Sequence, residues 1–243
     1  MVAYNLSHLT QADNQVVGGP IQDDEGLFLF ALIRCMRLRR VLEIGGLGGY
    51  SARNFLAAVG PLGVVYTVDI NPVPRLADNH ITIQRDCRTI DPKDLGSGPI
   101  DFVFFDCHAY EPQMTLLKNL QEGGVVHDRT VLGLHDTNTH PQKFAWWAFP
   151  TADGWVHQVA ERKMVNDLRN DGYEALMLHP DPGRHDESLP FRHGLTILSR
   201  NKYLLLDPPP GHRLPRKPLT IARIRGGLST RLRRWARRQG AHR

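Results

Sequence analysis

The sequence predicts an α/β protein built on a doubly wound, mostly parallel seven-stranded sheet with its last strand antiparallel and helices on both faces. Short apolar runs of four to six residues alternate with helical patterns, and Gly or Asp follows each of the first five runs within two residues. Alternation of this kind implies crossovers between parallel strands. A glycine-rich turn after the first run adds a feature that such sheets use to approach a ligand.

Each expected element follows from the spacing of its apolar residues. Four helices are expected, at residues 25–38, 50–58, 113–121 and 155–170, and either Asp23 or Asp24 could cap the first of them. The final two strands are separated by a turn-rich stretch at 179–189 and are expected to form an antiparallel pair. The seven expected strands are 40–44, 64–68, 81–84, 100–105, 130–134, 175–178 and 194–199.

One domain followed by a tail is expected: residues 1–205 form the sheet domain with a helical entry segment, and 206–243 form a proline-rich linker and a basic segment. The formal charge is +5, from 30 Lys and Arg against 25 Asp and Glu. Residues 212–243 hold 11 of these basic residues and no acid, which leaves 19 against 25 elsewhere, a charge of −6. The tail could contact an acidic partner or a membrane surface, or it could be a solvated disordered segment.

Membrane-spanning and disulfide-rich classes are disfavoured. The longest apolar stretches fall well short of the ~20 residues that a membrane helix needs. The first residues do not have the pattern of a signal peptide, so a cytoplasmic location is expected. The three cysteines, Cys35, Cys87 and Cys107, are an odd number without metal-ligand spacing, which predicts reduced thiols.

Four glycines occupy the turn between the first strand and the second helix. Glycine lets the backbone approach a ligand closely, and the start of the helix offers unpaired amides to a carboxylate or phosphate. The turn is therefore predicted to bind a ligand, although a tight packing turn is the alternative. The spacing departs from the dinucleotide pattern G-x-G-x-x-G, which weakens a nicotinamide interpretation. The predicted cofactor-binding residues here are Glu43, Gly45, Gly46, Gly48, Gly49, Tyr50 and Ser51.

Acids follow the second and third strands. Asp69 lies 24 residues after Gly45, where such folds bind the two hydroxyls of a ribose, and a solvated strand-end acid is the alternative. Asp86 could accept a hydrogen bond from the amino group of adenine, or it could cap a helix. Together these positions predict an adenosine-containing ligand.

At this point the sequence resembles class I S-adenosylmethionine-dependent methyltransferases. The resemblance rests on residues 41–51, Asp69 and residues 102–111, and it extends over about residues 17–200. Within this class, the sequence resembles more narrowly the small-molecule O-methyltransferases, a group that includes macrolide-sugar and catechol-type enzymes. In that group strand four typically ends D-G-D-H-x-Y and strand five ends in an acid pair or H-D. Here the two read D-C-H-A-Y at 106–110, one residue shorter, and L-H-D-T-N at 134–138.

The resemblance implies a Rossmann-like domain and S-adenosylmethionine (SAM) as cofactor, with Asp106 among its contacts. It also implies O-methylation of a small molecule or sugar, for which natural-product biosynthesis is the preferred setting. Asp106 and Asp136 follow strands whose carboxyl ends share one crevice, and two carboxylates with a nearby histidine or amide oxygen suit a divalent cation such as Mg2+. The expected metal ligands are thus Asp106, Asp136 and Asn138, and turn-capping acids are the alternative.

Methyl transfer to oxygen requires a base near the reacting hydroxyl. His108 is the first choice because it follows the strand-four acid by two residues, and imidazole titrates near neutral pH. His135 is the second choice, and His140 could also take the role. An aromatic group after strand five could cover the acceptor pocket, belong to the core, or form a contact in a homo-oligomer: Phe144, Trp146, Trp147 and Phe149.

Three other functions fit parts of the sequence. A nicotinamide-dependent oxidoreductase would use the same sheet, but no Tyr-x-x-x-Lys motif occurs. A nucleic-acid methyltransferase could use the basic tail for phosphate contacts, but strand four lacks an Asn-Pro-Pro-Tyr-like motif. A non-enzymatic protein could bind adenosine with its folded domain while its basic tail binds an acidic membrane or partner. The sequence does not name the methyl acceptor.

Overall fold

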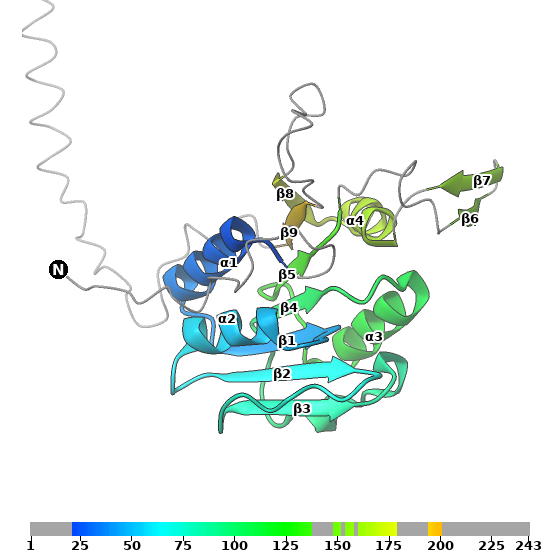
Figure 1. The fold of residues 1–243 in the computed structure, drawn as a ribbon. Coiled ribbons are helices and arrows are strands. Elements are labelled where there is room, and N and C mark those ends of the chain that lie inside the picture. Colours follow the sequence, from blue (N-terminus) through cyan, green and yellow to red (C-terminus); the bar gives the residue numbers. More distant parts are fainter. Residues whose placement is uncertain (1–20, 138–147, 152–153, 158–159, 179–193, 201–243) are drawn as a thin grey trace, which may run out of the picture. The chain divides into compact units, whose positions relative to one another are not determined.

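The computed structural model describes residues 21–137, 148–151, 154–157, 160–178 and 194–200 (Figure 1). Its main sheet has seven strands in the order β3-β2-β1-β4-β5-β9-β8. Strands β1 to β5 pair in parallel, and β9 is antiparallel to both β5 and β8. The predicted fold class is therefore confirmed. The strands are β1 (Arg40–Ile44), β2 (Val64–Asp69), β3 (His80–Gln84), β4 (Phe102–Phe105), β5 (Val131–Leu134), β8 (Glu174–Leu178) and β9 (Leu195–Ser199).

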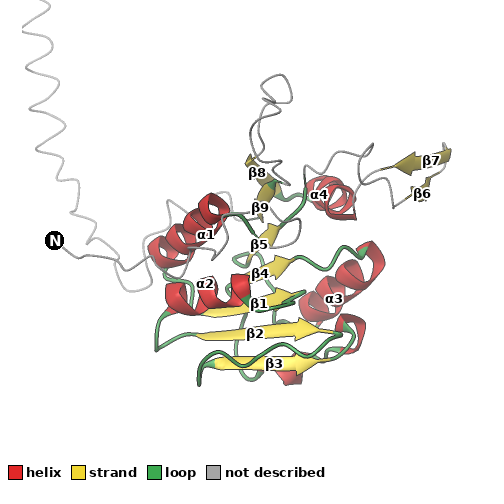
Figure 2. Cartoon of the chain, in the orientation of Figure 1, coloured by secondary structure: helices red, strands yellow, loops and turns green. Residues whose placement is uncertain are grey.

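Helices cover both faces of this sheet, because successive strand residues point to opposite sides. On one face, Phe55 packs edge-on against Phe102 and Phe104, with ring centroids 5.9 and 5.2 Å apart. On the other face, alternate strand residues form a core with Leu116 and Leu168 from two further helices. Figure 2 shows these helices in red around the yellow sheet. They are α1 (Asp23–Met36), α2 (Tyr50–Val59), α3 (Tyr110–Glu122) and α4 (Ala160–Asn170).

The four expected helices are present with different bounds. Helix α1 begins at Asp23 because Gln22, in extended conformation, is its N-cap, and the backbone amide of Gln22 donates to Glu25 at 2.9 Å. The cap is thus neither Asp23 nor Asp24. Two short 3-10 helices, η2 (Cys87–Thr89) and η3 (Pro92–Leu95), were not anticipated.

The prediction of a helix from residue 155 is wrong over residues 155–157, and residues 158 and 159 lie outside the described part of the chain. β7 (Gly154–His157) pairs antiparallel with β6 (Ala148–Thr151) as a separate two-stranded sheet. Adjacent aromatic and β-branched residues at 155 and 156 favour a strand once a partner is available, and that pairing is not visible as a sequence pattern. Helix α4 begins only at Ala160.

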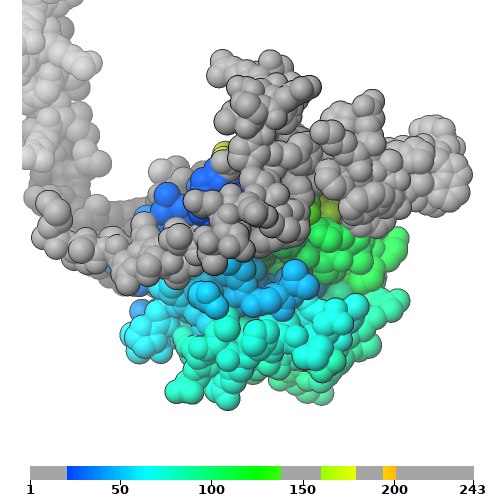
Figure 3. Space-filling view, in the orientation of Figure 1, coloured from blue at the N-terminus to red at the C-terminus, as the bar shows by residue number. Residues whose placement is uncertain are grey.

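The described residues all belong to Met1–Lys202, one of two units into which the chain divides. In the space-filling view, residues coloured from blue to green form one closely packed body (Figure 3). Among the described helices, none is long and apolar enough to cross a membrane. The expected linker and tail lie outside the described residues, as do Asn138, His140, Phe144, Trp146 and Trp147, and their roles stay predictions.

Candidate active site

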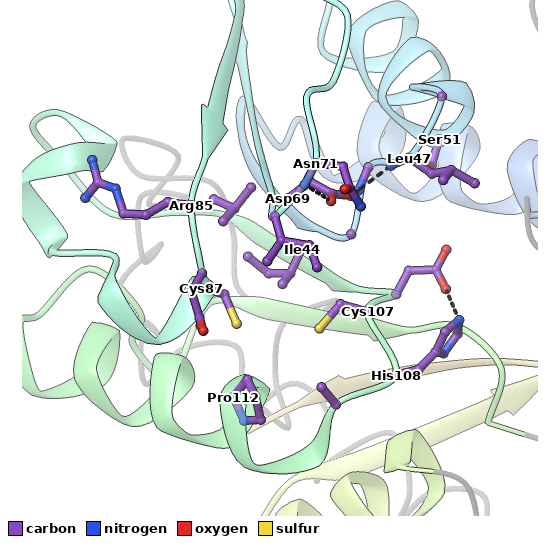
Figure 4. Close-up of a pocket in the computed structure, with 18 of the residues that line it drawn as sticks. Ile44, Leu47, Ser51, Asp69, Asn71, Arg85, Cys87, Cys107, His108 and Pro112 are labelled. Carbon is purple, nitrogen blue, oxygen red and sulfur yellow. Dashed lines mark hydrogen bonds and ion pairs between the residues drawn. The ribbon is translucent and has the colours of Figure 1, made fainter. Parts of the chain in front are cut away.

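A pocket of about 510 Å³ opens where the carboxyl ends of β1, β2 and β4 meet. Its wall is formed by the turn after β1, by the ends of β2 and β3, and by the segment that joins β4 to α3. Figure 4 shows Asp69 on one side of this pocket and His108 on another. Pockets at this edge of an open α/β sheet are where ligands bind.

The glycine-rich turn is shaped by close backbone packing. Gly45 has φ +91°, and a Cβ there would lie 2.4 Å from the carbonyl oxygen of Asp106, so a larger residue would have to displace the end of β4. Gly49 has φ +78° and is the N-cap of α2. Gly46 and Gly48 line the pocket. The turn therefore presents backbone to the cavity, as expected of a turn that meets a ligand.

Asp69 fixes the conformation of this turn. Its Oδ2 accepts hydrogen bonds from the backbone amides of Gly46 at 2.9 Å and Leu47 at 3.0 Å, and its Oδ1 accepts from the amide of Asn71 at 2.8 Å. An ionised carboxylate has about four acceptor positions, so capacity for a ligand hydroxyl remains. Asp69 also lines the pocket, as a ribose-binding acid must.

Glu43 lies wholly buried beneath the turn and does not line the pocket. Its Oε1 accepts from the Ser51 hydroxyl, and its Oε2 accepts from the Thr67 hydroxyl at 2.7 Å. Nε2 of His80 is 2.9 Å from the Thr67 oxygen, while Nδ1 of His80 accepts from the backbone amide of Leu76 at 3.2 Å. Burial raises the pKa of Glu43 to about 7 and lowers the pKa of His80. Glu43 thus supports the turn from below.

Two other predicted cofactor contacts have partners within the protein. Asp86 accepts from the backbone amide of Arg88 at 2.9 Å and caps η2, and the Arg88 guanidinium holds the pKa of Asp86 below its usual range. The capping alternative is therefore realised, although Asp86 also lines the pocket. Tyr50 donates its hydroxyl to Asp23 at 2.8 Å and lines the pocket as well.

Three predicted residues meet at the opposite side of the pocket, where Asp106 and His108 line it and Asp136 lies behind them without lining it. Nε2 of His108 lies 3.4 Å from Oδ2 of Asp136 and 3.8 Å from Oδ1 of Asp106. His108 and Asp136 both have left-handed backbones, with φ of 54° and 56°. Such conformations are costly for residues other than glycine and occur preferentially at functional sites. Ligand atoms of these three side chains all lie within 4.8 Å of one another, as metal coordination would require.

The surroundings of His108 favour its charged form. Burial opposes its charge, but the carboxylates of Glu161, Asp106 and Asp136 outweigh burial and raise the pKa of His108 to about 9. Burial likewise raises the pKa of Asp106, against the effect of neighbouring His135. This wall of the pocket therefore already stabilises one positive charge.

His135 is almost completely buried and does not line the pocket. Its Nε2 lies 3.2 Å from Glu25, and its Nδ1 lies 3.1 Å from Asp106 and 3.3 Å from Asp136. Burial opposes its charge, yet these carboxylates raise the pKa of His135 well above its usual range. Its position behind Asp106 and Asp136 suits orientation of the two acids better than contact with an acceptor.

Sequence reasoning missed Glu25 and Glu161, the carboxylates that contact the two histidines. Glu25 comes from the first turn of α1 and Glu161 from the first turn of α4, far from the strand-end motifs. The available signal was the placement of Glu161 on the apolar side of its helix, with Val165 and Leu168.

The three cysteines are free thiols, and Cys87 and Cys107 line the pocket.

Solved structures resemble this one over most of its length. The crystal structure of cofactor-bound Rv0187 from MTB shares 20% identity and a TM-score of 0.54, covering 80% of this chain and 86% of that one. The SAM complex of the O-methyltransferase TomG from Streptomyces achromogenes shares 20% identity and a TM-score of 0.52, covering 80% and 88%. The SAH-bound methyltransferase PaMTH1 from Podospora anserina shares 14% identity and a TM-score of 0.53, covering 80% and 86%.

The chain has the fold of SAM-dependent O-methyltransferases. The resemblance stated from residues 41–51, Asp69 and 102–111 is confirmed at the level of fold. No family model matches the sequence, and no curated protein matches it. Within this fold, the glycine-rich turn lines the same strand-end pocket as Asp106 and His108.

Proposed function

We propose that this chain is a SAM-dependent methyltransferase that methylates a hydroxyl group of a small molecule or a sugar. The observation that carries the proposal is one continuous pocket with two chemically different walls. One wall offers a glycine-rich turn and Asp69, and the other offers Asp106 and His108, with Asp136 close to both. A methyl donor and a hydroxyl acceptor need this combination in one enclosed space.

The first wall suits an adenosine-containing cofactor. Asp69 lines this wall and would accept hydrogen bonds from ribose hydroxyls, and Gly48, where an added Cβ would meet nothing within 4 Å, leaves room for the rest of the molecule. Ile70 is 70% exposed at the pocket, where its apolar surface can pack against a flat base. When bound, SAM supplies an electrophilic methyl group.

The second wall suits an acceptor hydroxyl. His108 is the proposed base because it lines the pocket and its Nε2 lies near the carboxylates of Asp106 and Asp136. An acceptor hydroxyl bound beside this wall would be within reach of Nε2. Only neutral His108 can take up the hydroxyl proton, and because its pKa is raised to about 9, this form is the major one only above that pH. Asp106 and Asp136 stabilise the imidazolium that results.

The same donor set fits a divalent cation. The ligand atoms of Asp106, His108 and Asp136 lie within 4.8 Å of one another. Carboxylate oxygens suit Mg2+ and Mn2+, and imidazole binds a metal only in its neutral form. His108 would take the place expected for Asn138, which lies outside the described residues. A cation held there would polarise the acceptor hydroxyl, and Nε2 of His108 would then coordinate the cation instead of acting as the base.

Isothermal titration with SAM, its demethylated product SAH, and NAD tests the cofactor assignment. We expect micromolar affinity for SAM and SAH, a loss of at least about tenfold in Asp69→Ala because a charge-assisted hydrogen bond is removed, and no binding of NAD. Asp128→Ala, an exposed acid, is the matched control and should bind as the wild type does. Binding of NAD alone, or of none of the three, would refute the proposal.

Titration with Mg2+ and Mn2+ by the same method tests the proposed cation site. We expect cation binding in the wild type and its loss in Asp136→Asn. A wild type that binds neither ion would leave His108 as base without metal assistance.

A further inference from the structure

Glu161 is a charged residue on the buried side of α4. Its side chain has no exposed surface, and it lies at helical spacing with Val165 and Leu168, which pack into the core. Burial of a carboxylate is costly unless partners compensate for the lost water. An apolar residue at this position would match the buried side of the helix better, and local exceptions of this kind occur mainly at functional sites.

The partners of Glu161 indicate which interaction its burial serves. Its Oε1 lies 3.2 Å from Nδ1 of His108 and accepts from Nε2 of Gln113 at 3.2 Å. Its Oε2 has no hydrogen-bond partner among the described residues, and neither has Oε1 of Gln113. A carboxylate that leaves one buried oxygen without a donor is not arranged for maximal stability. The contact with His108 is the one that connects Glu161 to the pocket.

The contact determines which nitrogen of His108 is turned toward the acid cluster. Nδ1 is engaged by Glu161, so Nε2 is the nitrogen near Asp136 and Asp106. His108 lines the pocket and its side chain is 35% exposed, whereas Glu161 lies behind it. The hydrogen bond made by one ring nitrogen fixes the role of the other.

We propose that Glu161 is a positioning residue, which holds the Nδ1 hydrogen of His108 and thereby turns Nε2 toward the methyl acceptor. The catalytic part rests on the proposed function, whereas the Glu161–His108 contact does not. In the transfer, the hydroxyl proton passes to Nε2, and the oxygen forms a bond to the methyl carbon. The carbon–sulfur bond breaks, and its electron pair stays on sulfur. Glu161 remains bonded to Nδ1 and stabilises the imidazolium that forms.

Nuclear magnetic resonance of the full chain labelled with 15N-histidine tests the contact without an acceptor. A hydrogen bond to a buried carboxylate should give the Nδ1 hydrogen of His108 a downfield, slowly exchanging resonance. His108→Asn assigns it by its disappearance, because Asn tolerates a left-handed backbone. We expect the resonance to be lost in Glu161→Ala and to move upfield in Glu161→Gln. Glu122→Gln, which changes an exposed residue of α3, should leave it in place.

Persistence of this resonance in folded Glu161→Ala would overturn the proposal. If that variant fails to fold, the isosteric Glu161→Gln decides, and an unchanged resonance there has the same meaning. A chain that shows the resonance but binds no SAM would refute the methyltransferase function and leave the contact intact.

Kinetics with an identified acceptor separates positioning from a structural role. For Glu161→Gln we expect kcat to fall about 10- to 100-fold, the range for residues that orient a functional histidine. Cofactor Kd should stay within about twofold, because Glu161 does not line the pocket. An equal loss of cofactor affinity and kcat would indicate a structural role and overturn the proposal.

Discussion

Glu43 lies beneath the glycine-rich turn with hydrogen bonds from Ser51 and Thr67 at its two carboxylate oxygens. Burial outweighs both bonds and raises its pKa from 4.5 to about 7. The folded protein therefore binds more protons than the unfolded chain between these pH values. The contribution of Glu43 to the free energy of unfolding is fully present below pH 4.5 and is lost as pH rises through 7.

Glu43→Gln should remove the fall in the free energy of unfolding that Glu43 causes between pH 4.5 and about 7. A shift of this size corresponds to on the order of 3 kcal/mol, so we expect the variant to be more stable than the wild type at pH 8 by up to that amount. The amide can accept from Thr67 and donate to Ser51, which preserves both contacts. Urea unfolding at pH 5, 6, 7 and 8 measures the difference. Parallel pH curves for the two proteins would contradict it, and Glu122→Gln is the exposed control.

At the scale of elements, the turn between β1 and α2 is held against the end of β4. Gly45 has φ +91°, and its missing side chain leaves room for the backbone carbonyl of Asp106. Gly48 lies in the same turn, yet a Cβ there would meet nothing within 4 Å, and its φ is ordinary. The two glycines therefore serve different purposes, the first for packing and the second for access to the pocket.

Gly45→Ala should destabilise the protein by about 3 kcal/mol or more, because left-handed strain adds to a clash with rigid backbone. Gly48→Ala should change the free energy of unfolding by no more than about 1 kcal/mol. Chemical denaturation of both variants at one pH provides the comparison. Equal effects at the two positions would show that the packing of the turn on β4 does not stabilise it.

At the scale of the whole molecule, the described residues that line the pocket come from β1, β2 and the segments that follow β1 to β4, all within Met1–Lys202. The cofactor site should therefore be independent of the basic segment. Deletion of residues 206–243 is expected to leave the Kd for SAM unchanged within about twofold, as titration of the truncated and full-length chains would measure. Loss of SAM binding in a folded truncated chain would place part of the site in the tail.

The sequence by itself determined the sheet and the acids and histidine that follow its strands at the pocket edge. Apolar runs alternating with helical patterns specify parallel strands, and residues directly after those strands must reach the same edge of the sheet, so Asp69, Asp106, His108 and Asp136 could be named in advance. Such inferences hold because they depend on chain order and on short-range spacing.

Only the tertiary structure decided which residues stand behind that edge of the pocket. Glu25 and Glu161 reach the histidines from α1 and α4, which are separated from them by 110 and 53 residues along the chain. The β6–β7 hairpin likewise depended on a partner strand rather than on its own periodicity. Contacts of this kind arise from packing between distant elements, and no local pattern encodes them. The burial that raises the pKa values of Glu43 and Asp106 arises from the same packing.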